Sequence, residues 1–170
     1  ASKNDINPNL IAFVAWRGDY LYSMDAVKGE EKGSTPRGIV RASKLIDGME
    51  ITDSFALDLI SASCGEAFAN EFGGYISIFK ELSWDEIFSN PSIVSKFNTD
   101  KAFAICGGLV GQLKHNPNLF ETILEVVDNL RSDYQAVALV MLYNQTQDIF
   151  KTHSMGSAMF KKLMKKHAKL

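Results

Sequence analysis

Apolar residues recur at helical spacing along most of this chain, and this periodicity constrains the fold more than any other feature. Between residues 53 and 72 the apolar positions include Phe55, Ile60 and Phe68, and further helical runs cover residues 99–115 and 116–130. Alternation of strand and helix segments, which an α/β sheet would require, is missing. The sequence therefore predicts an all-α helical bundle.

Several helix starts carry local signals. Asn7-Pro8 opens a pattern that runs to about Trp16, and Thr35 can cap a helix whose first turn holds Pro36 and which stops near Gly48. Asp53 or Ser54 begins the next pattern. Gly65 interrupts it, and the pair at 73–74 predicts either a break or a close contact between helices.

The remaining segments divide the chain more coarsely. Residues 17–34 contain three glycines and a charged run at 28–32, which predicts an exposed loop. Ser83 and Glu86 resemble a capping box. A helix opened by Ser132-Asp133 contains the run 136–142, which is apolar on all sides and predicts a buried central helix, although a strand is an alternative. We predict lid-like helices at 1–50 and a helical domain at 51–170, or one continuous domain.

Composition narrows the class of protein. The chain is 46% hydrophobic and carries a net charge of −2, which does not favour binding to nucleic acid. Cys64 and Cys106 lie in apolar helical patterns and are predicted to be buried free thiols. Neither a signal peptide nor an apolar run of membrane-spanning length is present. These features predict a cytoplasmic protein, and the missing initiator Met suggests a piece of a longer one.

Complete catalytic motifs are absent from the sequence. The phosphate-binding pattern GxxxxGK followed by Ser or Thr does not occur. His115, His153 and His167 are far apart and lack the neighbours typical of metal sites, so we predict no metal site. Ser63 lies in a serine-rich helix segment without the GxSxG spacing of a nucleophile. We therefore expect the isolated chain to be inactive and to bind no cofactor by itself.

Thr35-Pro36-Arg37 is the most informative constellation. Arg37 falls in the first turn of the predicted helix, where a cation is disfavoured by roughly 0.3–1 kcal/mol. Arg41 follows one turn later on the same face and adds a small like-charge cost. An anion beside the helix start would remove both costs, because free amides and a guanidinium can bind a phosphate together. The alternative is a pair of solvated arginines.

Three segments together resemble a continuous stretch of the MoxR-like AAA+ ATPases. They are Asn7-Pro8 with Phe13, the run from Arg17-Gly18-Asp19 to Asp25, and Thr35-Pro36-Arg37 with its helix to Leu45. The resemblance covers about residues 7–80, and only the third segment is reasonably specific. Ile39 and Val40 stand where the family usually has Trp and Glu.

This resemblance implies a function. In the family, the arginine of the third segment is the second sensor, which contacts the terminal phosphate of the nucleotide from the lid. Arg37 would take that role, with Thr35, Pro36 and Arg41 forming the rest of the nucleotide-binding site. ATP and Mg²⁺ would be held by an upstream AAA+ core, in a homo-oligomeric ring that remodels a partner protein.

Two other functions remain open at this stage. The chain could be a stand-alone helical adaptor that binds a partner helix in a groove between its long helices. It could also bind nucleic acid through the basic segment at 161–170, although a solvated helix end accounts for that segment equally simply. We expect neither nucleic acid nor a membrane as a partner.

Overall fold

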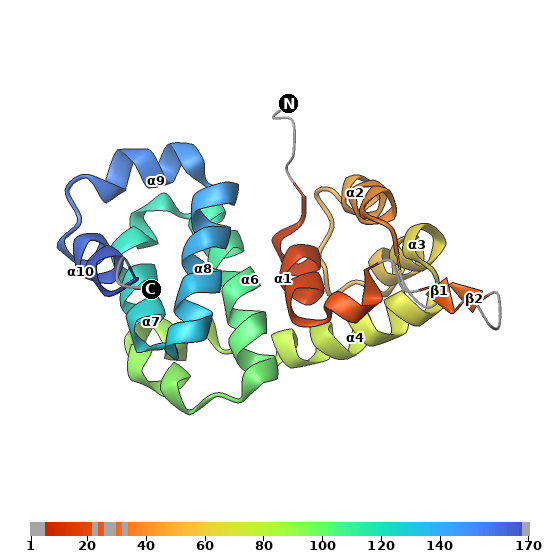
Figure 1. Cartoon of the computed structure of the whole chain (residues 1–170), viewed down its shortest axis with the longest axis horizontal. Coiled ribbons are helices and arrows are strands. Elements are labelled where there is room, and N and C mark those ends of the chain that lie inside the picture. The colour runs from red at the N-terminus through yellow and green to blue at the C-terminus, as the bar shows by residue number, and fades with distance from the viewer. Residues whose placement is uncertain (1–5, 22–23, 26–29, 32–33, 168–170) are drawn as a thin grey trace. The chain divides into compact units, whose positions relative to one another are not determined.

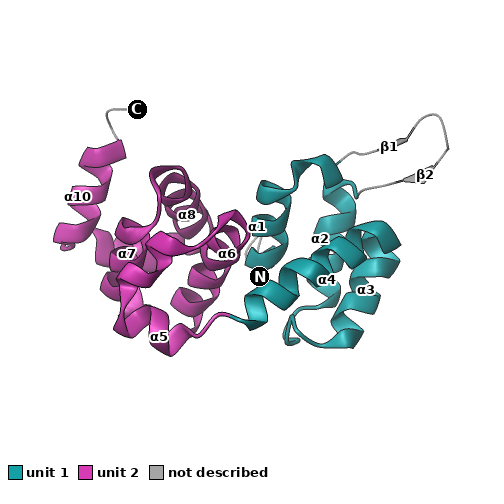
Figure 2. Ribbon diagram, turned by 90° about the horizontal axis from the view of Figure 1, so that it is seen from below, with its two compact units in different colours: residues 1–81 teal, residues 82–170 magenta. Residues whose placement is uncertain are grey.

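The computed structural model describes residues 6–21, 24–25, 30–31 and 34–167, and these form two compact units, residues 1–81 and 82–170 (Figure 2). Helices dominate both units, so the all-α prediction is confirmed. The extended structure in the described part of unit 1 is small. It consists of the antiparallel pair β1 (Met24–Asp25) and β2 (Glu30–Glu31), and a single bridge between Leu21 and Ser34. The rest of the predicted loop at 17–34 lies outside the described residues at 22–23, 26–29 and 32–33, which include residues 28, 29 and 32 of its charged run.

The helices of unit 1 begin at or near the residues predicted from the sequence. Its helical elements are α1 (Pro8–Trp16), the short 3-10 helix η1 (Gly18–Tyr20), α2 (Pro36–Leu45), α3 (Ser54–Cys64) and α4 (Glu66–Lys80) (Figure 1). Asn7 caps α1 by accepting a hydrogen bond from the Asn9 amide at 2.9 Å. Asp53 caps α3 in the same way through the Phe55 amide, also at 2.9 Å.

Aromatic side chains form the core of unit 1 around Phe13. The Phe13 ring is fully buried and lies 5.1 Å from the ring of Phe68, 5.4 Å from Phe72 and 5.9 Å from Tyr75. These edge-on arrangements are the favourable geometry for aromatic pairs. One residue of α1 thus joins that helix to successive turns of α4.

The glycines between α3 and α4 have different roles. Gly65 has φ +91°, a conformation that favours glycine, and it separates the two helices. Gly73 lies inside α4, which continues without interruption. A Cβ at Gly73 would lie 3.8 Å from Leu57 Cδ1 of α3. Of the two predicted alternatives for this pair of glycines, the break does not occur, and the contact of α3 with α4 at Gly73 has ordinary van der Waals spacing.

Unit 2 contains the three longer helices expected from the sequence. Its elements are α5 (Trp84–Ser89), η2 (Pro91–Lys96), α6 (Thr99–His115), η3 (Pro117–Leu119), α7 (Phe120–Asn129), α8 (Ser132–Gln145), α9 (Gln147–Ser154) and α10 (Ala158–His167) (Figure 1). Ser83 caps α5 through the Glu86 amide at 3.4 Å, as predicted. The α6 helix is buried along most of its length and packs against α8.

The sequence patterns did not indicate helix α9, nor the 3-10 helix η2. Helix α9 has eight residues, and Phe150 is its single buried side chain. At the end of α8, Thr146 donates from Oγ1 to the Leu142 carbonyl at 2.6 Å, and its own carbonyl accepts from the Phe150 amide. A short polar helix of this kind depends on tertiary packing, because isolated helices of this length are marginal in water.

The boundary between the units differs from the predicted division near residue 50. Helix α3 packs along α2, and α4 packs along α3. Residues 51–81 therefore belong with the first helices and not with the C-terminal ones. Their amphipathic patterns indicated helices but did not indicate which neighbours would cover them.

Both cysteines are buried and free, as predicted. Burial raises the pKa of the Cys106 thiol to about 12, and its sulfur lies 3.7 Å from the Tyr134 carbonyl oxygen. Burial also raises the pKa of Cys64, while a hydrogen bond with Ser34 partly opposes the shift. Both thiols are therefore protonated at neutral pH and are weak nucleophiles. Within the described residues, no helix is both long and apolar enough to cross a membrane.

Candidate functional site

The start of α2 has the local geometry that the sequence predicted. The Thr35 hydroxyl oxygen accepts a hydrogen bond from the Gly38 amide at 3.1 Å, and the Thr35 carbonyl accepts one from Ile39 at 3.1 Å. Pro36 occupies the first helical position, where its missing N–H costs nothing. Thr35 satisfies one of the amides that a helix start leaves unpaired.

Arg37 and Arg41 share the solvent-facing side of α2. Both side chains are exposed, whereas Ile39 and Ala42 are buried on the opposite side. Among the described residues, none forms a hydrogen bond or ion pair with either guanidinium group. Thr35, Pro36, Arg37 and Arg41 thus lie together at one exposed helix start, with both cations available to an external anion.

Ser34 fixes the position of this helix start. Its amide donates to the Tyr20 carbonyl at 2.8 Å, and its hydroxyl donates to the Thr35 carbonyl at 3.2 Å. Ser34 is buried beneath Gly38, where an added Cβ would clash with Ser34 Oγ and lie 2.9 Å from the Ser63 carbonyl oxygen. The first turn of α2 is therefore pressed against the end of α3. No pattern in the sequence indicates this close approach.

We predict that Gly38→Ala lowers the free energy of unfolding by about 1–3 kcal/mol, the usual cost of overpacking. The added methyl group must displace the backbone oxygen of Ser63, because Ser34 already fills the other side. Gly74→Ala is the matched control: Gly74 is also helical, and a Cβ there meets nothing within 4 Å. It should stabilise α4 by up to about 1 kcal/mol. Urea unfolding measures both, and equal stability of the two variants would contradict the prediction.

Arg17, in the second segment of the family resemblance, has contacts that sequence reasoning missed. Its guanidinium pairs with Asp19 at 3.3 Å and with Glu71 of α4 at 3.1 Å, and it lies 4.9 Å from the centre of the Tyr20 ring. The hydrogen bond with Asp19 is the main cause that raises the pKa of Arg17. These contacts tie η1 to α4. Arg17 is thus occupied within unit 1, in contrast with Arg37.

Two of the three histidines form hydrogen bonds within unit 2. His153 Nδ1 lies 2.9 Å from the Ile149 carbonyl oxygen, and His167 Nε2 lies 3.0 Å from Gln135 Oε1. Gln135 in turn donates to the carbonyls of Asp128 and Leu130, so this pair closes the end of α7. Among the residues with described positions, no three His, Cys, Asp or Glu side chains form a group that could hold a metal ion.

Comparison with known proteins adds no family assignment. No family model matches the chain, and neither the curated proteins nor the solved structures contain a significant match. The resemblance to MoxR-like ATPases therefore stays a prediction from the sequence segments between residues 7 and 80.

Proposed function

We propose that this chain is the C-terminal lid region of a MoxR-like AAA+ ATPase and that Arg37 senses the terminal phosphate of bound ATP. The observation that carries the proposal is the exposed guanidinium in the first turn of a capped helix, without a partner among the described residues. A guanidinium in this position costs stability unless an anion approaches it. ATP held by a neighbouring domain supplies such an anion.

The remaining catalytic parts come from a core domain outside this chain. The phosphate-binding loop, the acids that hold Mg²⁺ and an arginine finger have no counterparts in the sequence. In the proposed enzyme, Thr35 and Pro36 set the direction of the first turn, Arg37 contacts the phosphate, and Arg41 adds positive charge one turn later. Lid movement on hydrolysis then transmits force to a partner protein in a homo-oligomeric ring.

The family departures at Ile39 and Val40 affect packing and leave the sensor free. Ile39 is buried within unit 1, and Val40 is half-buried. Ile39 lies on the face opposite Arg37, whereas Val40 follows Arg37 by three residues and borders its exposed face. We therefore expect the proposed lid to contact its core differently from lids with Trp and Glu, while keeping the arginine accessible.

The test begins with the coding sequence upstream of Ala1. The proposal requires a phosphate-binding loop roughly 150–250 residues earlier, the size of a domain. In that full-length protein, we predict that Arg37→Ala lowers the rate of ATP hydrolysis by about tenfold or more, because a charge-assisted contact to the phosphate is lost. Arg37→Lys should restore part of the rate, since it keeps the charge without the fork of donors.

Lys44→Ala is the matched control, because Lys44 is an exposed cation in the last turn of the same helix. Its ATPase rate should equal that of the unchanged protein. Circular dichroism establishes that all variants are equally helical. An upstream sequence without a phosphate-binding loop, or an Arg37→Ala variant with unchanged turnover, would refute the proposal.

A further inference from the structure

Helix α8 leaves one apolar face uncovered. Its run at 136–142 is apolar on all sides, which predicted a buried central helix, and helix segments with this composition are normally enclosed. The structure buries Ala138, Leu139 and Leu142 but leaves Val140 59% exposed and Tyr143 47% exposed. The prediction of complete burial is thus wrong for this face. An apolar helix face left open in this way indicates a surface for a partner.

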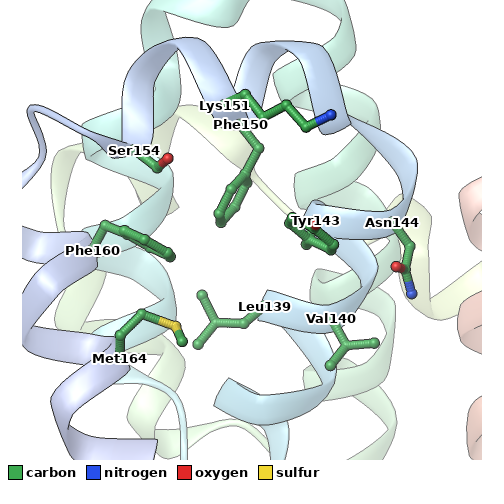
Figure 3. A pocket seen from close by; sticks show the side chains of 9 residues that line it. All are labelled: Leu139, Val140, Tyr143, Asn144, Phe150, Lys151, Ser154, Phe160 and Met164. Atoms are coloured by element: carbon green, nitrogen blue, oxygen red, sulfur yellow. The ribbon is translucent and has the colours of Figure 1, made fainter. Parts of the chain in front are cut away.

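The uncovered face forms one wall of a pocket between α8, α9 and α10, which we call the α8–α10 groove. Its volume is about 410 Å³, within the range of binding pockets. Six apolar side chains line most of it: Leu139, Val140, Tyr143, Phe150, Phe160 and Met164. Figure 3 shows Phe150 reaching into the groove from α9 and Phe160 and Met164 reaching into it from α10.

The base of this groove is preformed and its mouth is open. The Phe150 ring is buried and packs edge-on against Phe160 at 5.1 Å and against Tyr143 at 5.8 Å. At the edges, Val140, Tyr143 and Met164 remain exposed to solvent. An occupant therefore binds through the open mouth of the groove and remains partly exposed to solvent. Such an open apolar groove fits one face of a helix better than a small molecule.

Positive charge surrounds the groove. Helices α9 and α10 together carry five lysines and a single acidic residue, Asp148, in a chain whose net charge is −2. Lys151 itself lines the groove. Lys161 and Lys165 are exposed and directly follow the lining residues Phe160 and Met164. A partner with acidic residues beside its apolar surface complements this arrangement.

We propose that the α8–α10 groove binds an amphipathic helix of a partner protein, whose apolar stripe is flanked by acidic residues. Apolar side chains at helical spacing enter between Val140 and Met164, and carboxylates beside them approach Lys151, Lys161 and Lys165. This inference goes beyond the proposed lid function and does not depend on Arg37. It assigns a protein-binding role to a surface that ATP sensing does not use.

A display library of random peptides, selected for binding to residues 1–170, tests the proposal. The peptides have about 15 residues, which is long enough for a helix. The enriched peptides should place apolar residues at i, i+3 or i+4, and i+7, with Asp or Glu beside them. Synthetic versions labelled with a fluorophore then provide affinities by anisotropy. No enrichment, or enrichment of peptides without this pattern, overturns the proposal.

Met164→Glu places a carboxylate at the mouth of the groove and should weaken binding of the selected peptides about tenfold or more. Met155→Glu is the matched control, because Met155 is 83% exposed and does not line the groove. Its affinity should equal that of the unchanged chain. Both positions are open to solvent, so both variants should retain full helicity by circular dichroism. Equal affinity of Met164→Glu and the unchanged chain would show that the peptides bind elsewhere.

The charge requirement has its own test. Lys151→Glu combined with Lys165→Glu should weaken peptide binding at low ionic strength, and the difference should shrink as salt is added. Lys96→Glu serves as the control, because Lys96 is exposed on η2 and lies outside the groove. Equal affinity of the double variant and the Lys96→Glu control would remove the acidic requirement and overturn the proposal as stated.

Two other occupants are distinguished by separate measurements. Binding to vesicles of phosphatidylserine and phosphatidylcholine that Met164→Glu abolishes would identify a membrane surface instead. Self-association in sedimentation equilibrium that the same variant abolishes would identify a second copy of the chain. Either result would overturn the proposal of a partner helix. Absence of both, together with binding of the selected peptides, supports it.

Discussion

Phe13→Ala is expected to lower the free energy of unfolding of unit 1 by about 3–5 kcal/mol. The Phe13 ring is fully buried and touches Phe68, Phe72 and Tyr75 of α4 in edge-on geometry. Truncation removes these contacts and leaves a cavity that the surrounding rings cannot fill without leaving their rotamers. A loss of this size is a large part of the stability of an ordinary domain.

The two tryptophans allow the change to be assigned to unit 1. Trp16 lies in unit 1 and Trp84 in unit 2, so a Trp84→Phe background leaves Trp16 fluorescence as the probe of urea unfolding. Phe55→Ala is the matched control, because Phe55 is an exposed phenylalanine of α3. It should change stability by at most about 0.5 kcal/mol. Comparable losses in the two variants would show that Phe13 does not organise the core.

Helix starts could be predicted because their causes are local. Each of three capping side chains accepts a hydrogen bond from an amide two or three residues later; they belong to Thr35, Asp53 and Ser83. Residue types at this spacing can be recognised in the sequence alone. The same locality explains why Pro36 was placed correctly in the first turn of α2. Capping depends on neighbouring residues, so contacts with distant residues changed these helix starts little.

Contacts between distant residues could not be predicted in this way. Residues far apart in the chain meet where α3 and α4 pack within unit 1, where Gly38 approaches the Ser63 carbonyl, and where Arg17 pairs with Glu71. Periodicity identifies the face of a helix that will be buried but does not identify what will cover it. The predicted division near residue 50 differed from the observed units for this reason.

The same difference between local and distant contacts explains which functional residues could be predicted. Sequence reasoning placed Thr35, Pro36, Arg37 and Arg41 on one helix start, and the structure has all four there, because they lie within two helical turns. The α8–α10 groove escaped prediction, since its walls come from three helices and α9 was not anticipated. The apolar run at 136–142 of α8 indicated burial only, and the exposure of Val140 could not be predicted from it.

Phe150→Ala is expected to lower the free energy of unfolding of unit 2 by about 3–5 kcal/mol and to release α9. Phe150 is the single buried residue of that helix, and its ring packs at 5.4 Å against Phe120, besides its contacts with Tyr143 and Phe160. Without this anchor an eight-residue helix has too few internal hydrogen bonds to persist.

Tyr143→Ala is the matched control for Phe150→Ala, because it removes another aromatic ring of the same cluster from a half-exposed position. Tyr143→Ala should lower the free energy of unfolding by less than half as much as Phe150→Ala, since solvent already reaches the Tyr143 ring and a smaller apolar area is lost. A Trp16→Phe background leaves Trp84 as the fluorescent probe of unit 2, and hydrogen exchange of the amides in α9 reports its release directly. Protection of these amides in Phe150→Ala equal to that in the unchanged chain would show that α9 is held by its polar contacts instead. In that case α9 would remain a wall of the groove in the Phe150→Ala variant. Phe150 would then line the groove without anchoring the helix.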